Sequence, residues 1–178
     1  LTTLMHNIKS HADQPAEFLQ LLNSHFYKMI YNSGELIFAS AFYLVLDLEK
    51  KTARYASAGH PSPLLVDRRN GRVVPLTSHL TNNPALGLFP ESDYQTFSRS
   101  INKHDLFLMF TDGVFECSDV DGVEFGQARL KKLVEANQST DLHTLMALIA
   151  NTIKQYTEPH GLDDDVCLVG VEFFERSG

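Results

Sequence analysis

Aspartates flank two of the most apolar segments of the chain. Asp112, in Thr111-Asp112-Gly113, directly follows the apolar segment 106–110, and Asp164 belongs to an aspartate triplet that precedes the apolar segment 166–174. Bare carboxylates are costly to bury, and neighbouring aspartates repel one another. Carboxylate oxygens suit Mg²⁺ or Mn²⁺, and two such ions can bind a phosphate and lower the pKa of a water that attacks phosphorus. The pattern therefore indicates metal-assisted hydrolysis of a phosphoester.

A simpler interpretation accounts for the same residues. Asp112 would cap a turn, and the aspartate triplet would begin a solvated strand. The two sites lie far apart in the chain, so only the fold could bring them together, and spacing leaves both interpretations open. A third unusual motif, Gly59-His60, starts a proline-rich turn, where a histidine is more simply structural than catalytic.

Hydrophobic periodicity places these motifs in an α+β fold with mainly antiparallel sheets layered with helices. The apolar run 36–46 is typical of a central strand, and Asn70-Gly71 predicts a type I′ hairpin. A helix from residue 15 should bury Leu19, Leu22, Phe26 and Met29. The other expected strands are 54–58, 63–66, 73–74, 94–101, 105–110 and 166–174.

Three further helices are expected. Residues 1–8 carry an apolar helical stripe with no capping residue before it, as the end of a longer helix would, and 127–137 forms a second helix. The third, 141–156, begins behind a Ser139-Thr140 cap. Its buried face comprises Leu142, Leu145, Ile149 and Ile153.

The composition of the chain limits the fold classes and the kinds of partner that it can have. The chain has 178 residues, of which 43% are hydrophobic, enough for a single domain spanning 1–178, and a formal net charge of −7. The hydrophobic content excludes a disordered chain, and no apolar run reaches the roughly 20 residues of a membrane span. An acidic domain without a basic stripe is a poor ligand for nucleic acid or anionic membranes. Cys117 and Cys167 form no CxxC pattern, and no signal peptide is visible, so we expect a cytoplasmic protein.

Six segments carry motifs in a fixed order, among them Gly59-His60, Thr111-Asp112-Gly113 and Asp164-Asp165. Together they resemble the SpoIIE/RsbU-type bacterial subfamily of PP2C-like metal-dependent serine/threonine phosphatases, whose fold is an α/β/β/α sandwich. The resemblance implies the C-terminal portion of such a domain. The segments are 38–47, 58–65, 84–88, 105–116, 124–126 and 164–166.

The resemblance also implies site residues, a cofactor and a substrate. Asp112 and Asp164 fall on metal ligands of a two-metal Mn²⁺ or Mg²⁺ site, and Asp165 and Gly113 would support them. No catalytic side chain is implied, because a metal-activated water attacks phosphoserine or phosphothreonine. The substrate would be a phosphorylated regulatory protein, with an anti-sigma-factor antagonist as the candidate, and the domain would be the output of a bacterial signalling protein. A homodimer is a further expectation.

The start of the chain departs from the family pattern. The family's first strands carry an aspartate and an Asp…Ser-Gly-His-Gly stretch that complete the metal site, and neither occurs here. Either those strands precede residue 1, as the uncapped first helix favours, or the chain is a catalytically incomplete pseudophosphatase that acts as a partner-binding or dimerisation module.

Two smaller motifs have simple interpretations. Asp119-Val120-Asp121-Gly122 resembles the start of a calcium loop, but its glycine comes too early and no glutamate follows at the required position, so we expect a turn. Cys167 stands where family members often carry threonine, and its apolar neighbour Val166 indicates a residue packed in the core.

Overall fold

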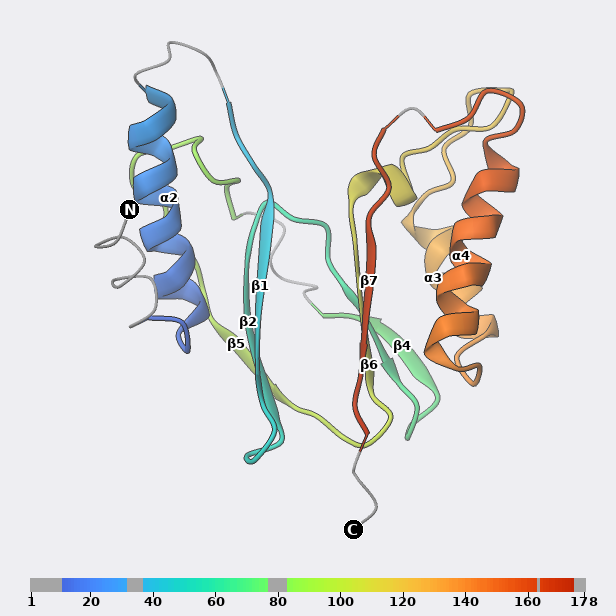
Figure 1. Ribbon diagram of the computed structural model, residues 1–178, viewed down its shortest axis with the longest axis horizontal. Helices are drawn as coiled ribbons and strands as arrows, with labels where there is room; N and C mark the ends of the chain where they lie inside the picture. The colour runs from blue at the N-terminus through green and yellow to red at the C-terminus, as the bar shows by residue number, and fades with distance from the viewer. Residues whose placement is uncertain (1–10, 32–36, 77–82, 163, 175–178) are drawn as a thin grey trace. The chain divides into compact units, whose positions relative to one another are not determined.

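The computed structural model describes residues 11–31, 37–76, 83–162 and 164–174 (Figure 1). The chain divides into two compact units, which are described separately. Unit 1 comprises Leu1–His60 and His79–Ile101, and unit 2 comprises Pro61–Ser78 and Asn102–Gly178. The helix expected at 1–8 lies outside the described residues. Among the described residues, none of the helices combines the length and apolar character that a membrane crossing requires.

Unit 1 is a three-stranded antiparallel sheet with one helix along it. The strand order is β1-β2-β5, and the helix α2 packs against β2 and β1 (Figure 1). Pro15 suits the first helical turn because its missing N–H needs no partner there. The elements are α2 (Pro15–Tyr31), β1 (Ala41–Asp47), β2 (Thr52–Ala58) and β5 (Phe97–Ser100).

The core of unit 1 lies between α2 and the sheet. Leu19 of α2 and Ala56 and Ala58 of β2 are fully or almost fully buried, and the small alanines let the helix approach the strand closely. The Phe18 ring stacks on Tyr43 of β1 with 3.9 Å between ring centroids. These contacts hold α2 against the sheet.

Unit 2 is a four-stranded antiparallel sheet covered on one face by two helices. The strand order is β4-β3-β6-β7, and α3 and α4 lie side by side over it (Figure 1). The elements are β3 (Leu64–Asp67), β4 (Arg72–Pro75), β6 (Leu106–Phe110), the 3₁₀ turn η1 (Asp112–Val114), α3 (Gln127–Ala136), α4 (Leu142–Tyr156) and β7 (Leu168–Glu172).

The core of unit 2 follows from the two periodicities of the sequence. Alternate residues of β6, with Leu108 at their centre, belong to the same buried cluster as residues of α3 and α4 spaced by three or four positions. The helix residues are Leu130, Val134, Leu145, Ile149 and Ile153. The α+β class with antiparallel sheets, and the helices expected at 15–29, 127–137 and 141–156, are thereby confirmed.

Two details of the expected strands are wrong. The run 36–46 contributes β1, which stands at the end of its sheet among the described strands, whereas β2 is central. The β3–β4 hairpin exists, but Asp67 pairs with Arg72 across a four-residue loop. Only Gly71 of the Asn70-Gly71 pair has a positive φ, of 62°, so the turn is not type I′. Instead, the Asp67 carboxylate accepts the Asn70 backbone N–H at 3.1 Å.

Two details of the expected helices are also wrong. Met29 is 68% exposed, while Ile30 beside it is buried together with Asn23. The cap of α4 is Asp141 and not Ser139-Thr140: its carboxylate accepts the Thr144 backbone N–H at 2.9 Å. An aspartate is at least as good an N-cap as serine or threonine, and it lies directly before the first helical residue.

Candidate active site

Asp112 lies in a tight turn at the end of β6. Residues 112–114 form η1, in which the backbone N–H groups of Phe115 and Glu116 both donate to the Asp112 carbonyl at 2.9 Å. The Asp112 carboxylate is exposed and accepts the Gly113 N–H at 3.1 Å. The turn thus stops the strand and presents the carboxylate at its end.

Thr111 fastens this turn to the segment that leads into β7. Its backbone N–H donates to the Cys167 carbonyl at 3.1 Å, which extends the β6–β7 ladder beyond Phe110 and Leu168. Its hydroxyl accepts the Cys167 N–H at 2.9 Å and donates to the Asp165 carbonyl at 3.1 Å. One side chain therefore fixes the position of the Asp164–Asp165 backbone relative to Asp112.

Gly113 brings the two aspartate motifs into contact. A methyl group in place of its hydrogen would lie 2.7 Å from the Asp165 carbonyl oxygen and 3.6 Å from the Asp164 carbonyl carbon. Any side chain here would push the two segments apart. The structure therefore places the Asp112 turn directly against Asp164 and Asp165, although the two motifs are distant in sequence.

The electrostatics of the site differ from the sequence-based expectation in one respect. Asp112, Asp164 and Asp165 are all exposed, so solvent reduces their mutual repulsion, and burial contributes little to it. The Asp164 carboxylate accepts the Asp165 N–H at 2.7 Å. Asp163, the first residue of the triplet, lies outside the described residues.

The donor set can be compared with what a divalent cation requires. Within the described part of the chain, no three or more His, Cys, Asp or Glu side chains gather as a metal site would. Mg²⁺ commonly takes one or two carboxylates and keeps several waters, and Mn²⁺ accepts the same hard oxygen ligands. Two exposed carboxylates on segments that touch at Gly113 fit such a cation.

Other candidate residues have structural contacts. The His60 N–H lies 3.3 Å from the Ser57 hydroxyl, and the His60 ring lies 6.1 Å from that of Phe42, which are the contacts of a turn residue. The prediction for Cys167 is wrong: it is exposed, whereas Cys117 is buried. Side chains alternate along the β6–β7 ladder, which the Thr111–Cys167 pairing extends, so Cys167 lies on the same exposed face as Val169.

The 119–122 loop is a turn, as expected. The Asp119 carboxylate accepts the backbone N–H groups of Val123 at 2.9 Å and Asp121 at 3.0 Å, and Gly122 has a φ of 75°. These hydrogen bonds, that from Val123 foremost, lower the pKa of Asp119. The carboxylate is therefore engaged by its own backbone, as in an Asx turn.

The role of Thr111 is not apparent from the sequence, where it is only one residue of the Thr-Asp-Gly motif. In the structure its hydroxyl bonds to the Asp165 carbonyl and the Cys167 N–H, and so joins the two aspartate motifs. A threonine at the end of an apolar strand is a common strand residue. Only the pairing of β6 with β7 reveals what its hydroxyl contacts.

Comparison with known proteins gives consistent matches. The family described as Stage II sporulation protein E (SpoIIE) matches residues 1–174. The phosphoserine phosphatases RsbP and RsbU of Bacillus subtilis are each 25% identical to the chain, over 89% and 78% of its length. The chain spans only 37% and 40% of these two relatives.

Solved structures share the fold. The SiaA-PP2C domain of Pseudomonas aeruginosa matches 96% of this chain and 65% of its own, with a TM-score of 0.80 and 20% identity. The manganese-presoaked phosphatase domain of SpoIIE from Bacillus subtilis matches 98% of this chain and 75% of its own, with a TM-score of 0.69 and 15% identity. The antiparallel sheets and their helices are thus those of PP2C-like domains. With the family match running through both units, the chain belongs to the family described as Stage II sporulation protein E (SpoIIE), and it has the fold of PP2C-like domains.

Proposed function

We propose that the chain is the C-terminal portion of a single phosphatase domain that hydrolyses phosphoserine or phosphothreonine on a regulatory protein. The observation that carries the proposal is the contact between the Asp112 turn and the Asp164–Asp165 segment, made by Thr111 and permitted by Gly113. The names of RsbP and RsbU, both phosphoserine phosphatases, support the same reaction.

Asp112 and Asp164 are the proposed ligands of Mn²⁺ or Mg²⁺. When bound, the cation supplies Lewis acidity toward the phosphoryl group and an activated water. The chain itself holds the proposed ligands in place. The turn η1 places Asp112 at the end of β6, and the Thr111 hydroxyl bonds to the backbone carbonyl of Asp165. Gly113, which has no side chain, lets the two segments touch. Asp165 contributes through its backbone, whose N–H donates a hydrogen bond to the Asp164 carboxylate.

The proposed substrate is a phosphorylated anti-sigma-factor antagonist, and a second copy of the chain is a further proposed partner. Phosphoserine in a small regulatory protein is the chemistry that the named relatives indicate. Sequence and fold do not by themselves fix the partner, so the substrate protein rests on this analogy.

The test is hydrolysis of para-nitrophenyl phosphate and of a phosphoserine peptide with Mn²⁺, Mg²⁺ or a chelator. We expect turnover that depends on the added cation from the natural protein, in which the proposed domain includes the family's first strands. Asp112→Asn or Asp164→Asn should each reduce turnover at least about a hundredfold, because even residues that only orient metal ligands cost 10–100-fold. Asp121→Asn, on an exposed turn of the same unit, is the matched control and should keep full activity.

Two results would count against the proposal. Full activity in Asp112→Asn would remove it from the metal site. A natural protein that is folded but inactive with either cation would favour the partner-binding or dimerisation module instead, which size-exclusion chromatography with light scattering would then examine.

A further inference from the structure

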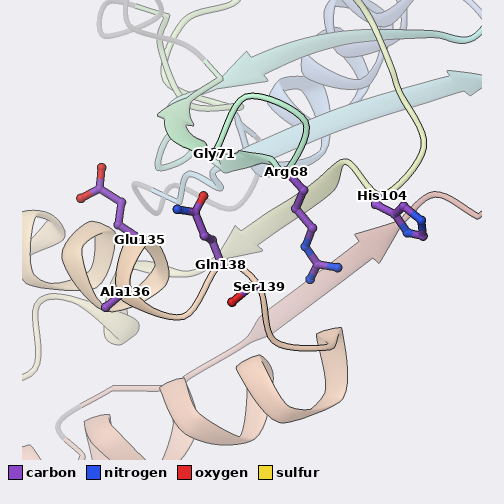
Figure 2. Close-up of a pocket in the computed structure, with 7 residues that line it drawn as sticks. All are labelled: Arg68, Gly71, His104, Glu135, Ala136, Gln138 and Ser139. Carbon is purple, nitrogen blue, oxygen red and sulfur yellow. The ribbon is translucent and has the colours of Figure 1, made fainter.

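The loop between β3 and β4 carries an Asn-Gly pair that has no part in the candidate active site. Asp67 pairs with Arg72 across this loop, and Asn70 and Gly71 are its last two residues. Both are exposed, and Gly71 also lines an open cavity of about 520 Å³, beside which Figure 2 shows it. Water therefore reaches this pair of residues.

An asparagine that is followed by glycine has a specific chemical reactivity. Asparagine is one of the thermolabile residues, because the backbone nitrogen of the next residue can attack its side-chain amide carbon and close a five-membered ring. A side chain on the next residue obstructs this approach, and glycine has none. A Cβ placed on Gly71 would have no atom within 4 Å, so the neighbouring structure also leaves the approach open.

The hydrogen bonds of the loop leave the attacking nitrogen unengaged. The Asn70 backbone N–H and side-chain Nδ2 donate to the Asp67 carboxylate at 3.1 and 2.8 Å, and these bonds hold the first part of the loop. Gly71 lies outside β3 and β4, and its N–H donates no hydrogen bond within the described part of the chain. The backbone around Gly71 is therefore not fixed by a bond that ring closure would have to break.

We propose that Asn70 is a modification site, which converts spontaneously to aspartate and isoaspartate. The Gly71 nitrogen loses its proton to hydroxide and attacks Cγ of Asn70. The new C–N bond forms as the bond from Cγ to Nδ2 breaks, and Nδ2 takes up a proton from water and leaves as ammonia. Water then opens the cyclic imide at one of its two carbonyl carbons, which gives aspartate or isoaspartate. The proposal is independent of the phosphatase reaction, because neither residue belongs to the candidate active site.

The reaction replaces a hydrogen bond of the loop with a repulsive contact. Asn70 Nδ2 lies 2.8 Å from the Asp67 carboxylate, and in the product a second carboxylate replaces this donor. Isoaspartate also adds one carbon atom to the main chain. The same loop holds Arg68, whose guanidinium bonds to the Glu172 carboxylate at 2.5 Å and the Thr140 carbonyl at 2.6 Å. The hairpin is thus tied to β7 and to the segment before α4, so its distortion should destabilise unit 2.

The test is incubation of the folded chain at 37 °C and pH 8, followed by mass spectrometry of the peptide that contains Asn70. We expect this peptide to gain the mass that replacement of NH by O adds, and to separate into two products, one of which a protein-isoaspartyl methyltransferase labels. The rate should rise with pH, because the Gly71 nitrogen must lose its proton. The modified chain should melt about 2–4 °C lower, the shift expected when a chain of this size loses one hydrogen bond.

Asn102 of the same unit is a matched internal control. Its backbone N–H and Nδ2 also donate to an aspartate, Asp105, at 2.8 and 3.3 Å, but Lys103 follows it instead of glycine. Asn102 should therefore stay unmodified over the same time. In Asn70→Gln, ring closure would need a six-membered imide, so modification at residue 70 should fall to the level found at Asn102. Asn70→Asp supplies one product directly and should show the lower melting temperature without incubation.

Three results would overturn the proposal. The first is an unchanged mass at Asn70 in the folded chain after a time in which the chain unfolded in urea is fully modified. The second is equal modification at Asn102. The third is aspartate as the sole product, which would mean direct hydrolysis of the side-chain amide without ring closure. A wild-type melting temperature in Asn70→Asp would refute the predicted effect on the hairpin.

Discussion

Replacing Gly113 with alanine tests the geometry of the candidate active site directly. The new methyl group would lie 2.7 Å from the Asp165 carbonyl oxygen, and real Cβ atoms essentially never come within 3.0 Å of another heavy atom. Gly113 has an ordinary backbone conformation, so the whole effect is steric. Because the obstructing atom belongs to the backbone, the Asp164–Asp165 segment must move by at least 0.3 Å, from 2.7 to 3.0 Å.

The magnitude follows from overpacking. Forcing an extra methyl group into a filled site costs about 1–3 kcal/mol, which lowers the melting temperature of a chain this size by about 2–12 °C. The displaced segment also carries the hydrogen bond from Thr111 to the Asp165 carbonyl. Misplacing reacting groups by a fraction of an ångström to 1 Å can cost up to about a hundredfold in rate. We expect Gly113→Ala to lose at least tenfold in cation-dependent phosphatase activity.

A control variant with a similar loss of stability separates the effect on folding from the effect on catalytic geometry. Gly122 has a φ of 75° with nothing within 4 Å of a new methyl group, so Gly122→Ala strains the backbone by about 1–2 kcal/mol without touching the site. Thermal unfolding by circular dichroism and initial rates with Mn²⁺ are measured for both variants. Wild-type activity in Gly113→Ala, or an equal loss of activity in Gly122→Ala, would refute the reasoning.

Three further changes probe other contacts. Thr111→Val removes the hydroxyl that joins the two aspartate motifs, and should cost about 1 kcal/mol of stability in thermal unfolding and reduce activity, whereas unchanged activity would show that the backbone pairing suffices. Asn23→Leu leaves the buried Gly87 N–H without its 2.8 Å partner and should destabilise the chain by about 1–3 kcal/mol in urea unfolding; equal stability would mean that water replaces the bond. Asp141→Ala should lower the melting temperature at pH 7, because hydrogen bonds from the Thr144 hydroxyl and N–H lower the pKa of Asp141 from its ordinary 3.8. Because the pKa of Asp141 is lower in the folded state, its carboxylate stabilises the fold at pH values above 3.8, and this stabilisation is lost as the pH falls through the lowered pKa. The difference in melting temperature between Asp141→Ala and wild type should therefore narrow below about pH 4, and a difference that stays constant would contradict the cap.

Periodicity located most helices and strands, and on the buried face of α2 it was wrong at one residue, Met29. The apolar stripe Leu19, Leu22, Phe26 and Met29 fits a helix, yet the buried side of α2 runs through Asn23 and Ile30. Asn23 is buried because its side chain bonds to the Gly87 N–H and the Phe89 carbonyl, contacts that no local pattern reports. Leu22 and Phe26 of the predicted stripe pack against the core as expected, so only Met29 was assigned wrongly, and Asn23 was missed because it is polar.

Local sequence patterns could not predict which strands pair with one another. The contact of Leu65 with Phe107 joins β3 to β6 across a long stretch of chain, and nothing in either segment specifies the other. The segment 94–101 looked like one strand, but only Phe97–Ser100 finds partners along β2. The aspartates could be singled out by type and by resemblance, whereas their proximity depends on the β6–β7 ladder, which is a tertiary property.

The division of the chain between its two units limits how the protein can be cut. The backbone passes from one unit to the other three times, after residues 60, 78 and 101. A break after residue 101 would leave the second fragment without β3 and β4, and since β3 lies between β4 and β6, it would strip β6 of a neighbour and create a bare, aggregation-prone edge. Neither unit exists as a continuous stretch of sequence, so gene fusion or recombination at a single junction cannot transfer one without fragments of the other.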